Sequence, residues 1–265
     1  MMQEGSASAF MELLRQRCRN SQIDWETVLE VSYMTLLVGL PAPGVLDIGG
    51  HSGRHAKIFT SVLHAGHVVV FEPLPPLAAA LEKEFLLCAN VKVVACALSN
   101  WRGATTFVVK TSAPEESGLK ARLSYNDGAE GDLQEIKVRV ETLDDFSIPF
   151  KVDFIKIDTE GGEVDILKGA AKLLRRDQPI VSVEYGPSGF GAYGHTAETL
   201  YDLADDQGYD LYDLFGNRFA SREEWSACVG RFYWDYLMIP RGRAAALANR
   251  IAALRAGAAS LSGAA

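Results

Sequence analysis

The sequence predicts a doubly wound α/β fold built on a mostly parallel sheet. From Gly44 onward, strand-like runs rich in Val and Ile alternate with helix-like stretches. The runs are almost continuously apolar, as expected of parallel strands that are buried on both faces. The expected strands lie at residues 45–48, 68–71, 91–98, 152–157 and 180–184. The expected helices between them span residues 53–64, 76–87 and 162–175.

Two regions interrupt this alternation. Residues 104–110 and 135–143 resemble strands joined by a polar loop, and they predict an added antiparallel or edge element. Residues 209–215 and 232–239 are aromatic-rich strands between which no helix is expected. They predict a terminal antiparallel pair.

The ends of the chain are expected to be helical. Helices are predicted over residues 7–20 and 24–39, and Asp24 is expected to cap the second one. We find no internal repeat and no interdomain linker. The sequence therefore predicts an N-terminal helical extension or lid over residues 1–43, an α/β ligand-binding domain over residues 44–240, and a C-terminal helix and tail over residues 241–265.

Composition argues against several classes of partner and predicts a cytoplasmic protein. The formal charge of −8 argues against a nucleic-acid partner, because phosphate binding requires clustered Lys and Arg. The start of the chain lacks the basic and apolar regions of a signal peptide, and no apolar run is long enough to span a membrane. The cysteines are scattered, which suits a reducing compartment.

An apolar stripe of Leu247, Ile251 and Leu254 predicts packing onto the domain or onto a second copy in a homodimer.

The stretch VLDIGGHSGRHAKIF, residues 45–59, is a glycine-rich turn between a strand and a helix. Missing side chains at such a turn let a ligand approach the backbone. Ile48 stands where the dinucleotide fingerprint G-x-G-x-x-G has its first glycine, so the looser D-x-G-x-x-x-G of S-adenosylmethionine-binding proteins fits better. Taken alone, the pattern also suits an ordinary strand-to-helix turn.

The second expected strand favours a nucleoside ligand. It ends at Glu72, 19 residues after Gly53. An acidic residue there can accept hydrogen bonds from both hydroxyls of a ribose, although it could also be a solvated loop residue. The glycine-rich turn and Glu72 together do not show whether the ligand is NAD or S-adenosylmethionine. The sequence contains no Tyr-x-x-x-Lys pair, which weighs against a short-chain dehydrogenase.

Several motifs together resemble one family. DIGGHSG, FEPLPPL, CALSN, ETLDDF, DFIKIDTEGGEVDILKGA and PIVSVEYG follow one another from about Val45 to Tyr185. In this order they resemble the FkbM family of S-adenosylmethionine-dependent methyltransferases. The resemblance implies a Rossmann-like class I methyltransferase fold, with a mostly parallel seven-stranded sheet and an antiparallel last strand. It also implies O-methylation of sugars or secondary metabolites. The family generally has Asn at the position of His51, so this turn departs from the pattern.

The resemblance also implies a set of cofactor contacts. The first turn would contact the methionine part of S-adenosylmethionine, Glu72 the ribose hydroxyls, and residues around Ala97 and Leu98 the adenine. The expected cofactor-binding residues are Asp47, Gly49, Gly50, His51, Gly53, Glu72, Pro73, Ala97, Leu98 and Asp158.

The methyl acceptor is expected at the carboxyl ends of the later strands. An alcohol must lose its proton during methyl transfer, and a carboxylate or a histidine could accept it. The candidates are Asp158, Glu184 and His195. Asp158 could instead cap the helix near Gly162, and His195 could simply precede the next helix. Glu163 is expected to have a structural role at the helix N-terminus.

Metal binding at this point is an open alternative. Asp158, Glu160, Glu184 and His195 offer ligands for Mg²⁺, but their spacing is not diagnostic and metal-free transfer is preferred. No metal-binding residue is assigned. The predicted function is a methyltransferase that acts on a hydroxyl of a small metabolite, secondary metabolite or sugar, with N-methylation still open. The alternatives are a nicotinamide-dependent oxidoreductase and a non-catalytic nucleoside-binding module.

Overall fold

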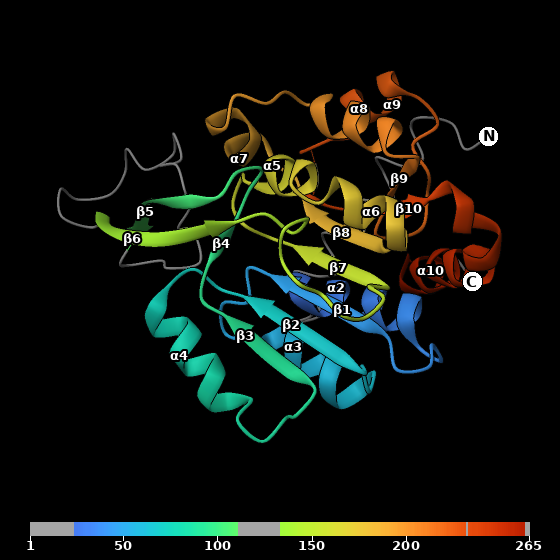
Figure 1. Ribbon diagram of the computed structural model, residues 1–265. Coiled ribbons are helices and arrows are strands. Elements are labelled where there is room, and N and C mark those ends of the chain that lie inside the picture. The colour runs from blue at the N-terminus through green and yellow to red at the C-terminus, as the bar shows by residue number, and fades with distance from the viewer. Residues whose placement is uncertain (1–23, 111–132, 232, 263–265) are drawn as a thin grey trace.

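A seven-stranded sheet forms the centre of the protein. The computed structural model describes residues 24–110, 133–231 and 233–262, so the helix predicted over residues 7–20 lies outside them (Figure 1). In spatial order the strands are β3 (Val91–Val94), β2 (His67–Phe71), β1 (Gly44–Ile48), β7 (Phe154–Ile157), β8 (Ile180–Glu184), β10 (Asp235–Pro240) and β9 (Tyr209–Asp213). Neighbours are parallel except β10, which runs antiparallel to both β8 and β9. The predicted sheet is confirmed, including its antiparallel strand.

Helices cover both faces of this sheet (Figure 1). One face packs against α2 (Trp25–Leu37), α3 (Arg54–Lys57) with the π-helical turn Ile58–Val62, α4 (Pro75–Glu84) and α10 (Ala244–Ser262). The other packs against α5 (Glu163–Lys168), α6 (Ala171–Asp177), α8 (Thr199–Asp206) and α9 (Arg222–Cys228). A short helix α7 (Pro187–Ala192) follows β8. Side chains that alternate along each strand supply the two cores, as Phe154 and Ile155 do in β7.

The two ends of the described chain meet on one face. Asp24 caps α2, because its side chain accepts a hydrogen bond of 2.7 Å from the backbone N–H of Thr27. Leu247, Ile251 and Leu254 of α10 are buried in the same core as α2. The apolar stripe of α10 therefore packs onto its own chain. Within the part of the chain that the structure describes, no helix combines the length and apolar character needed to cross a membrane.

A second, three-stranded sheet stands apart from the first, with the order β4 (Ala97–Leu98), β6 (Leu133–Glu141) and β5 (Gly103–Lys110). β5 and β6 form the expected antiparallel pair, which lies to the left of the seven-stranded sheet in Figure 1. The single strand predicted over residues 91–98 is divided between the two sheets. Its break lies at Cys96, whose backbone N–H donates to the carbonyl of Val94.

Two predicted features are wrong in detail. The helix expected over residues 162–175 is interrupted at Gly169, where a side chain would lie 2.1 Å from the backbone oxygen of Ser99. The connection between β9 and β10 does contain a helix, α9. Ser221 caps it by accepting from the N–H of Glu224, whose carboxylate accepts from the N–H of Ala220. This arrangement resembles a capping box, and its signal was present in the sequence as S-R-E-E.

Candidate functional site

A cavity of about 520 Å³ lies at the carboxyl edge of the sheet. Its wall comes from the ends of β1, β2, β7 and β8, from β4, from the start of β10 and from the first turn of α2. Parallel α/β sheets bind ligands at this edge, and the volume suits a ligand of cofactor size. Because β10 is antiparallel, its first residue lies at the same edge as the last residue of β8.

The glycines of the first turn accommodate neighbouring protein atoms. A Cβ at Gly49, where φ is +81°, would lie 1.8 Å from the backbone oxygen of Asp158. One at Gly50 would lie 2.2 Å from Cγ1 of Val70, and one at Gly53 would lie 2.7 Å from Cδ2 of Leu81. The expectation that these missing side chains make room for a ligand is therefore corrected. They let the turn after β1 pack closely against β2, α4 and the residue that follows β7.

The backbone of the same turn still faces the cavity. Gly49, Gly50 and His51 line it, whereas Gly53 does not appear in the lining. His51 has a φ of +42°, a left-handed conformation that Asn adopts more readily than His. The departure from the family pattern thus falls at a position where the backbone itself favours Asn.

Glu72 is fixed in the cavity wall by the backbone on either side. One carboxylate oxygen accepts a hydrogen bond of 2.8 Å from the N–H of His51, and the other accepts one of 2.9 Å from the N–H of Leu74. Burial raises the pKa of Glu72 in spite of these two bonds. Each carboxylate oxygen has more than one lone pair, so both can still accept from the hydroxyls of a ribose. Pro73, which follows, also lines the cavity.

An apolar wall continues from Glu72. Ala97 and Leu98 of β4 line the cavity together with Leu77, Cys96 and Phe107. Such a surface suits a flat base such as adenine, and it adjoins the residue proposed to bind the ribose. The chemistry of these residues therefore fits a nucleoside.

Lys156, which the sequence reasoning missed, joins β1 to β7. Its ammonium donates a hydrogen bond of 2.7 Å to the backbone oxygen of Gly49 and lies 3.5 Å from Asp47 and 3.3 Å from Asp158. Burial would lower the pKa of Lys156, but the two carboxylates outweigh burial and raise it. Asp47 is fully buried behind the turn and does not line the cavity. A lysine inside the apolar strand FIKI was the available signal.

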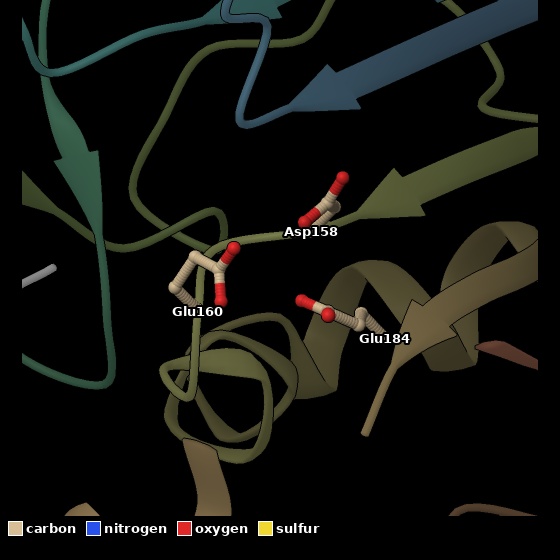
Figure 2. A group of neighbouring side chains, drawn as sticks. All are labelled: Asp158, Glu160 and Glu184. Carbon is tan, nitrogen blue, oxygen red and sulfur yellow. The ribbon is translucent and has the colours of Figure 1, made fainter. Parts of the chain in front are cut away.

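Three carboxylates converge where β7 and β8 end. Figure 2 shows Asp158, Glu160 and Glu184 pointing toward one another, and an oxygen from each lies within 4.8 Å of the others. All three line the cavity. Burial favours neutral Asp158, yet the charge of Lys156 and the hydrogen bonds from Glu184 and Lys156 together outweigh burial and lower the pKa of Asp158. Acidic groups also gather in this way without an ion, so Mg²⁺ binding here stays a prediction.

Two alternatives for the acidic segment after β7 have clear outcomes. Asp158 does not cap α5, because the N-cap residue is Gly162. Glu163 has a structural role: its carboxylate accepts from the backbone N–H groups of Thr159 and Gly161 and so fixes the turn before the helix. Burial raises the pKa of Glu163 to about 6.

His195 lies apart from the cluster. Its imidazole Nε2 is 3.5 Å from a carboxylate oxygen of Asp165 on α5, and His195 is not among the residues that line the cavity. Of the three candidates for a proton acceptor, the structure therefore brings only Asp158 and Glu184 into the cavity.

The first turn of α2 supplies a further wall that the sequence reasoning missed. Trp25 and Glu26 line the cavity. Nε1 of Trp25 donates a hydrogen bond of 2.6 Å to Asp235 at the start of β10, and Glu26 lies 3.0 Å from Nε2 of His55 on α3. For Asp235 a signal was available, because the first residue of a reversed strand lies at the carboxyl edge.

Comparison with known protein families identifies a methyltransferase domain in this chain. The sequence profile described as the methyltransferase FkbM domain matches residues 47–211, more than half of the chain. Methyltransferase sdnD of Sordaria araneosa is 24% identical over 208 residues, which cover 66% of this chain and 77% of that protein. The profile match gives no support to a nicotinamide-dependent oxidoreductase or to a non-catalytic module.

Solved structures of methyltransferases are also similar. An FkbM methyltransferase from Methylobacillus flagellatus shares 18% identity at a TM-score of 0.45, and the match covers 74% of this chain but only 43% of that one. CalS10 of Micromonospora echinaspora, described as an amino pentose methyltransferase bound to S-adenosylmethionine, shares 13% identity at a TM-score of 0.34 over 66% of this chain and 58% of that one. On the strength of the profile match, the chain belongs to the FkbM family of methyltransferases, whose cofactor is S-adenosylmethionine.

Proposed function

We propose that the protein methylates a hydroxyl group of a small metabolite, secondary metabolite or sugar. The observation that carries the proposal is the division of one cavity into two chemically different parts. The cofactor half comprises the lining residues of β1, β2 and β4 and of the turns that follow them. The acceptor half comprises those of α2, β7, β8 and β10 and of the turns after β7 and β8, and it holds the acidic side chains Glu26, Asp158, Glu160, Glu184 and Asp235.

The cofactor half supplies the groups that would hold S-adenosylmethionine. Glu72 would accept from the ribose hydroxyls, the turn at Gly49, Gly50 and His51 would face the methionine part, and Ala97 and Leu98 would contact the adenine. When bound, S-adenosylmethionine supplies an electrophilic methyl group on a positively charged sulfur. The protein's task is then to align an acceptor oxygen with that methyl group and to exclude water.

The acceptor half must orient the hydroxyl and take its proton. Asp158 keeps its charge because Lys156 lowers its pKa, so it suits hydrogen bonding better than proton transfer. Glu184, at the end of the next strand, is the remaining cavity residue among the proton acceptors predicted from sequence. A positioned base of this kind accelerates transfer by about 10²–10⁴-fold.

The regions outside the α/β core support a small-molecule acceptor. Trp25 and Glu26, within the predicted extension over residues 1–43, line the acceptor half, which supports a role for this extension in enclosing the acceptor. The formal charge of −8 favours a small molecule over a nucleic acid.

Calorimetric titration with S-adenosylmethionine, S-adenosylhomocysteine and NAD tests the cofactor assignment. We expect the two sulfur nucleosides to bind and NAD not to bind. In Glu72→Gln their affinity should fall about 10- to 100-fold, because hydrogen bonds to a charged acceptor are lost. Glu82→Gln, an exposed change on α4, is the matched control and should bind like the wild type. Binding of NAD alone would refute the proposal.

An acceptor screen tests the reaction itself. Transfer of labelled methyl groups to a panel of sugars, polyols and their amino derivatives is followed by mass spectrometry of the products. We expect the label on oxygen. Products methylated only on nitrogen would contradict O-methylation and leave the cofactor assignment intact.

A further inference from the structure

Asp235 occupies a position that suits the methyl-transfer step. It is the first residue of β10 and lies opposite Glu184 in the antiparallel pairing of β10 with β8. Asp158, Glu184 and Asp235 are thus ends of three neighbouring strands, and all line the acceptor half of the cavity. Asp235 completes this row from a part of the chain remote from the motifs of the family.

The carboxylate of Asp235 has a fixed orientation. Its Oδ2 accepts the 2.6 Å hydrogen bond from Trp25, and the indole of Trp25 stacks on Tyr233 with ring centroids 6.0 Å apart. A carboxylate offers about four lone-pair positions, so one hydrogen bond leaves capacity for a ligand. The contact therefore holds the group in place without saturating it.

The charged groups around Asp235 are mostly acidic. They are Glu26 on α2, Asp158 just after β7 and Glu184 on β8, with Lys156 as the basic neighbour. Burial raises the pKa of Asp235 to about 7, and Asp158 and Glu26 act in the same direction against the Trp25 bond. Above this pH the position carries a negative charge that a cationic ligand would stabilise.

We propose that Asp235, held by Trp25, faces the sulfonium of the bound cofactor and favours S-adenosylmethionine over S-adenosylhomocysteine. The inference rests on the proposed function. The substrate form of the cofactor carries a positive charge at sulfur that the product form lacks, and the two are otherwise alike apart from one methyl group. A negative charge at this end of the cavity therefore selects the form that can react.

The ratio of the two dissociation constants tests the proposal without an acceptor. Calorimetry at pH 8.5, where Asp235 is ionised, gives the Kd of S-adenosylhomocysteine divided by that of S-adenosylmethionine. In Asp235→Asn this ratio should fall about four- to fifteenfold, as expected for charges roughly 10 Å apart at an effective dielectric constant of about 20–40. The amide oxygen can still accept from Trp25, so the fold should survive, which circular dichroism checks.

Two further variants separate charge from structure. Asp235→Glu keeps the charge and should keep the ratio within about twofold of the wild type. Asp202→Asn makes the same change at an exposed residue that pairs with Arg222, and should leave the ratio unchanged. If Asp235→Asn fails to fold, Asp235→Ser removes the same charge with a smaller side chain.

Failure of this proposal and failure of the proposed function give different results in these titrations. A ratio unchanged in the folded neutral variant, including an equal loss of affinity for both nucleosides, would overturn the proposal and leave Asp235 as a structural partner of Trp25. A wild-type protein that binds neither nucleoside would instead refute the proposed function.

Discussion

The two halves of the cavity are built in different ways. The cofactor half is made largely of backbone and close packing: the glycines of the first turn let strands approach, and Glu72 is held by two backbone N–H groups. The acceptor half is made of side chains, many of them acidic, from segments far apart in the sequence, such as Trp25 and Asp235. We therefore expect a change at the glycines of the first turn to cost more stability than a change to a side chain of the acceptor half.

The largest expected loss of stability follows a substitution in the cofactor half. In Gly49→Ala the new methyl group would collide with the backbone oxygen of Asp158, and the left-handed φ adds strain. We expect a loss of unfolding free energy of about 4 kcal/mol or more, measured by urea denaturation. Gly191→Ala is the control, because nothing lies within 4 Å of its added Cβ, and it should change stability by less than about 1 kcal/mol. Equal stability of both variants would contradict backbone packing as the basis of this half.

The next effect concerns Lys156, which joins the halves. Lys156→Met leaves Asp47 and Asp158 without their shared counter-charge, and Asp47 is fully buried. The unfolding free energy should fall by about 3–5 kcal/mol. Lys168→Met removes an exposed lysine that pairs with Asp165, and should cost less than about 1 kcal/mol. Similar small losses in the two variants would show that the halves do not depend on Lys156.

A smaller effect, visible as a pH dependence, comes from Glu163 in the turn beneath the acceptor half. Its pKa in the folded protein is about 6, above the ordinary value of 4.5. A raised carboxyl pKa contributes stability that is fully present below pH 4.5 and is lost as the pH rises through 6. From pH 4 to pH 8 the wild type should therefore lose about 2 kcal/mol relative to Glu163→Gln. Urea midpoints of both proteins across this range measure the difference, and a constant difference would exclude the shift.

The smallest expected change in stability concerns a residue of the cofactor half. His51 has a left-handed φ, and Asn tolerates this conformation better. His51→Asn should stabilise the protein by roughly 0.5–1 kcal/mol and keep the backbone bond to Glu72. His67→Asn, in the extended backbone of β2, should show no such gain in thermal unfolding. A destabilised His51→Asn protein would mean that the imidazole makes contacts that outweigh the backbone preference.

Much of the fold was predictable because its signals are local. Val- and Ile-rich runs predicted the parallel strands, and Asp24 predicted the start of α2. Features that depend on distant contacts were missed or wrong. The break of the helix at Gly169 arises from its approach to Ser99, and the division of residues 91–98 between two sheets depends on pairing of β4 with β6. Helix α9 was missed for another reason, because its capping residues Ser221 and Glu224 are recognisable in the sequence.

The sequence by itself determined the family, the order of the motifs along the chain and the residues at the ends of β1, β2 and β7. Each of these features lies within a short continuous segment. Only the tertiary structure decided what the glycines accommodate, that His195 lies beside Asp165, and that Trp25 reaches Asp235. The physical reason is the same in each case. Trp25 and Asp235 are 210 positions apart in the chain, and no local pattern of residues encodes a contact across that separation.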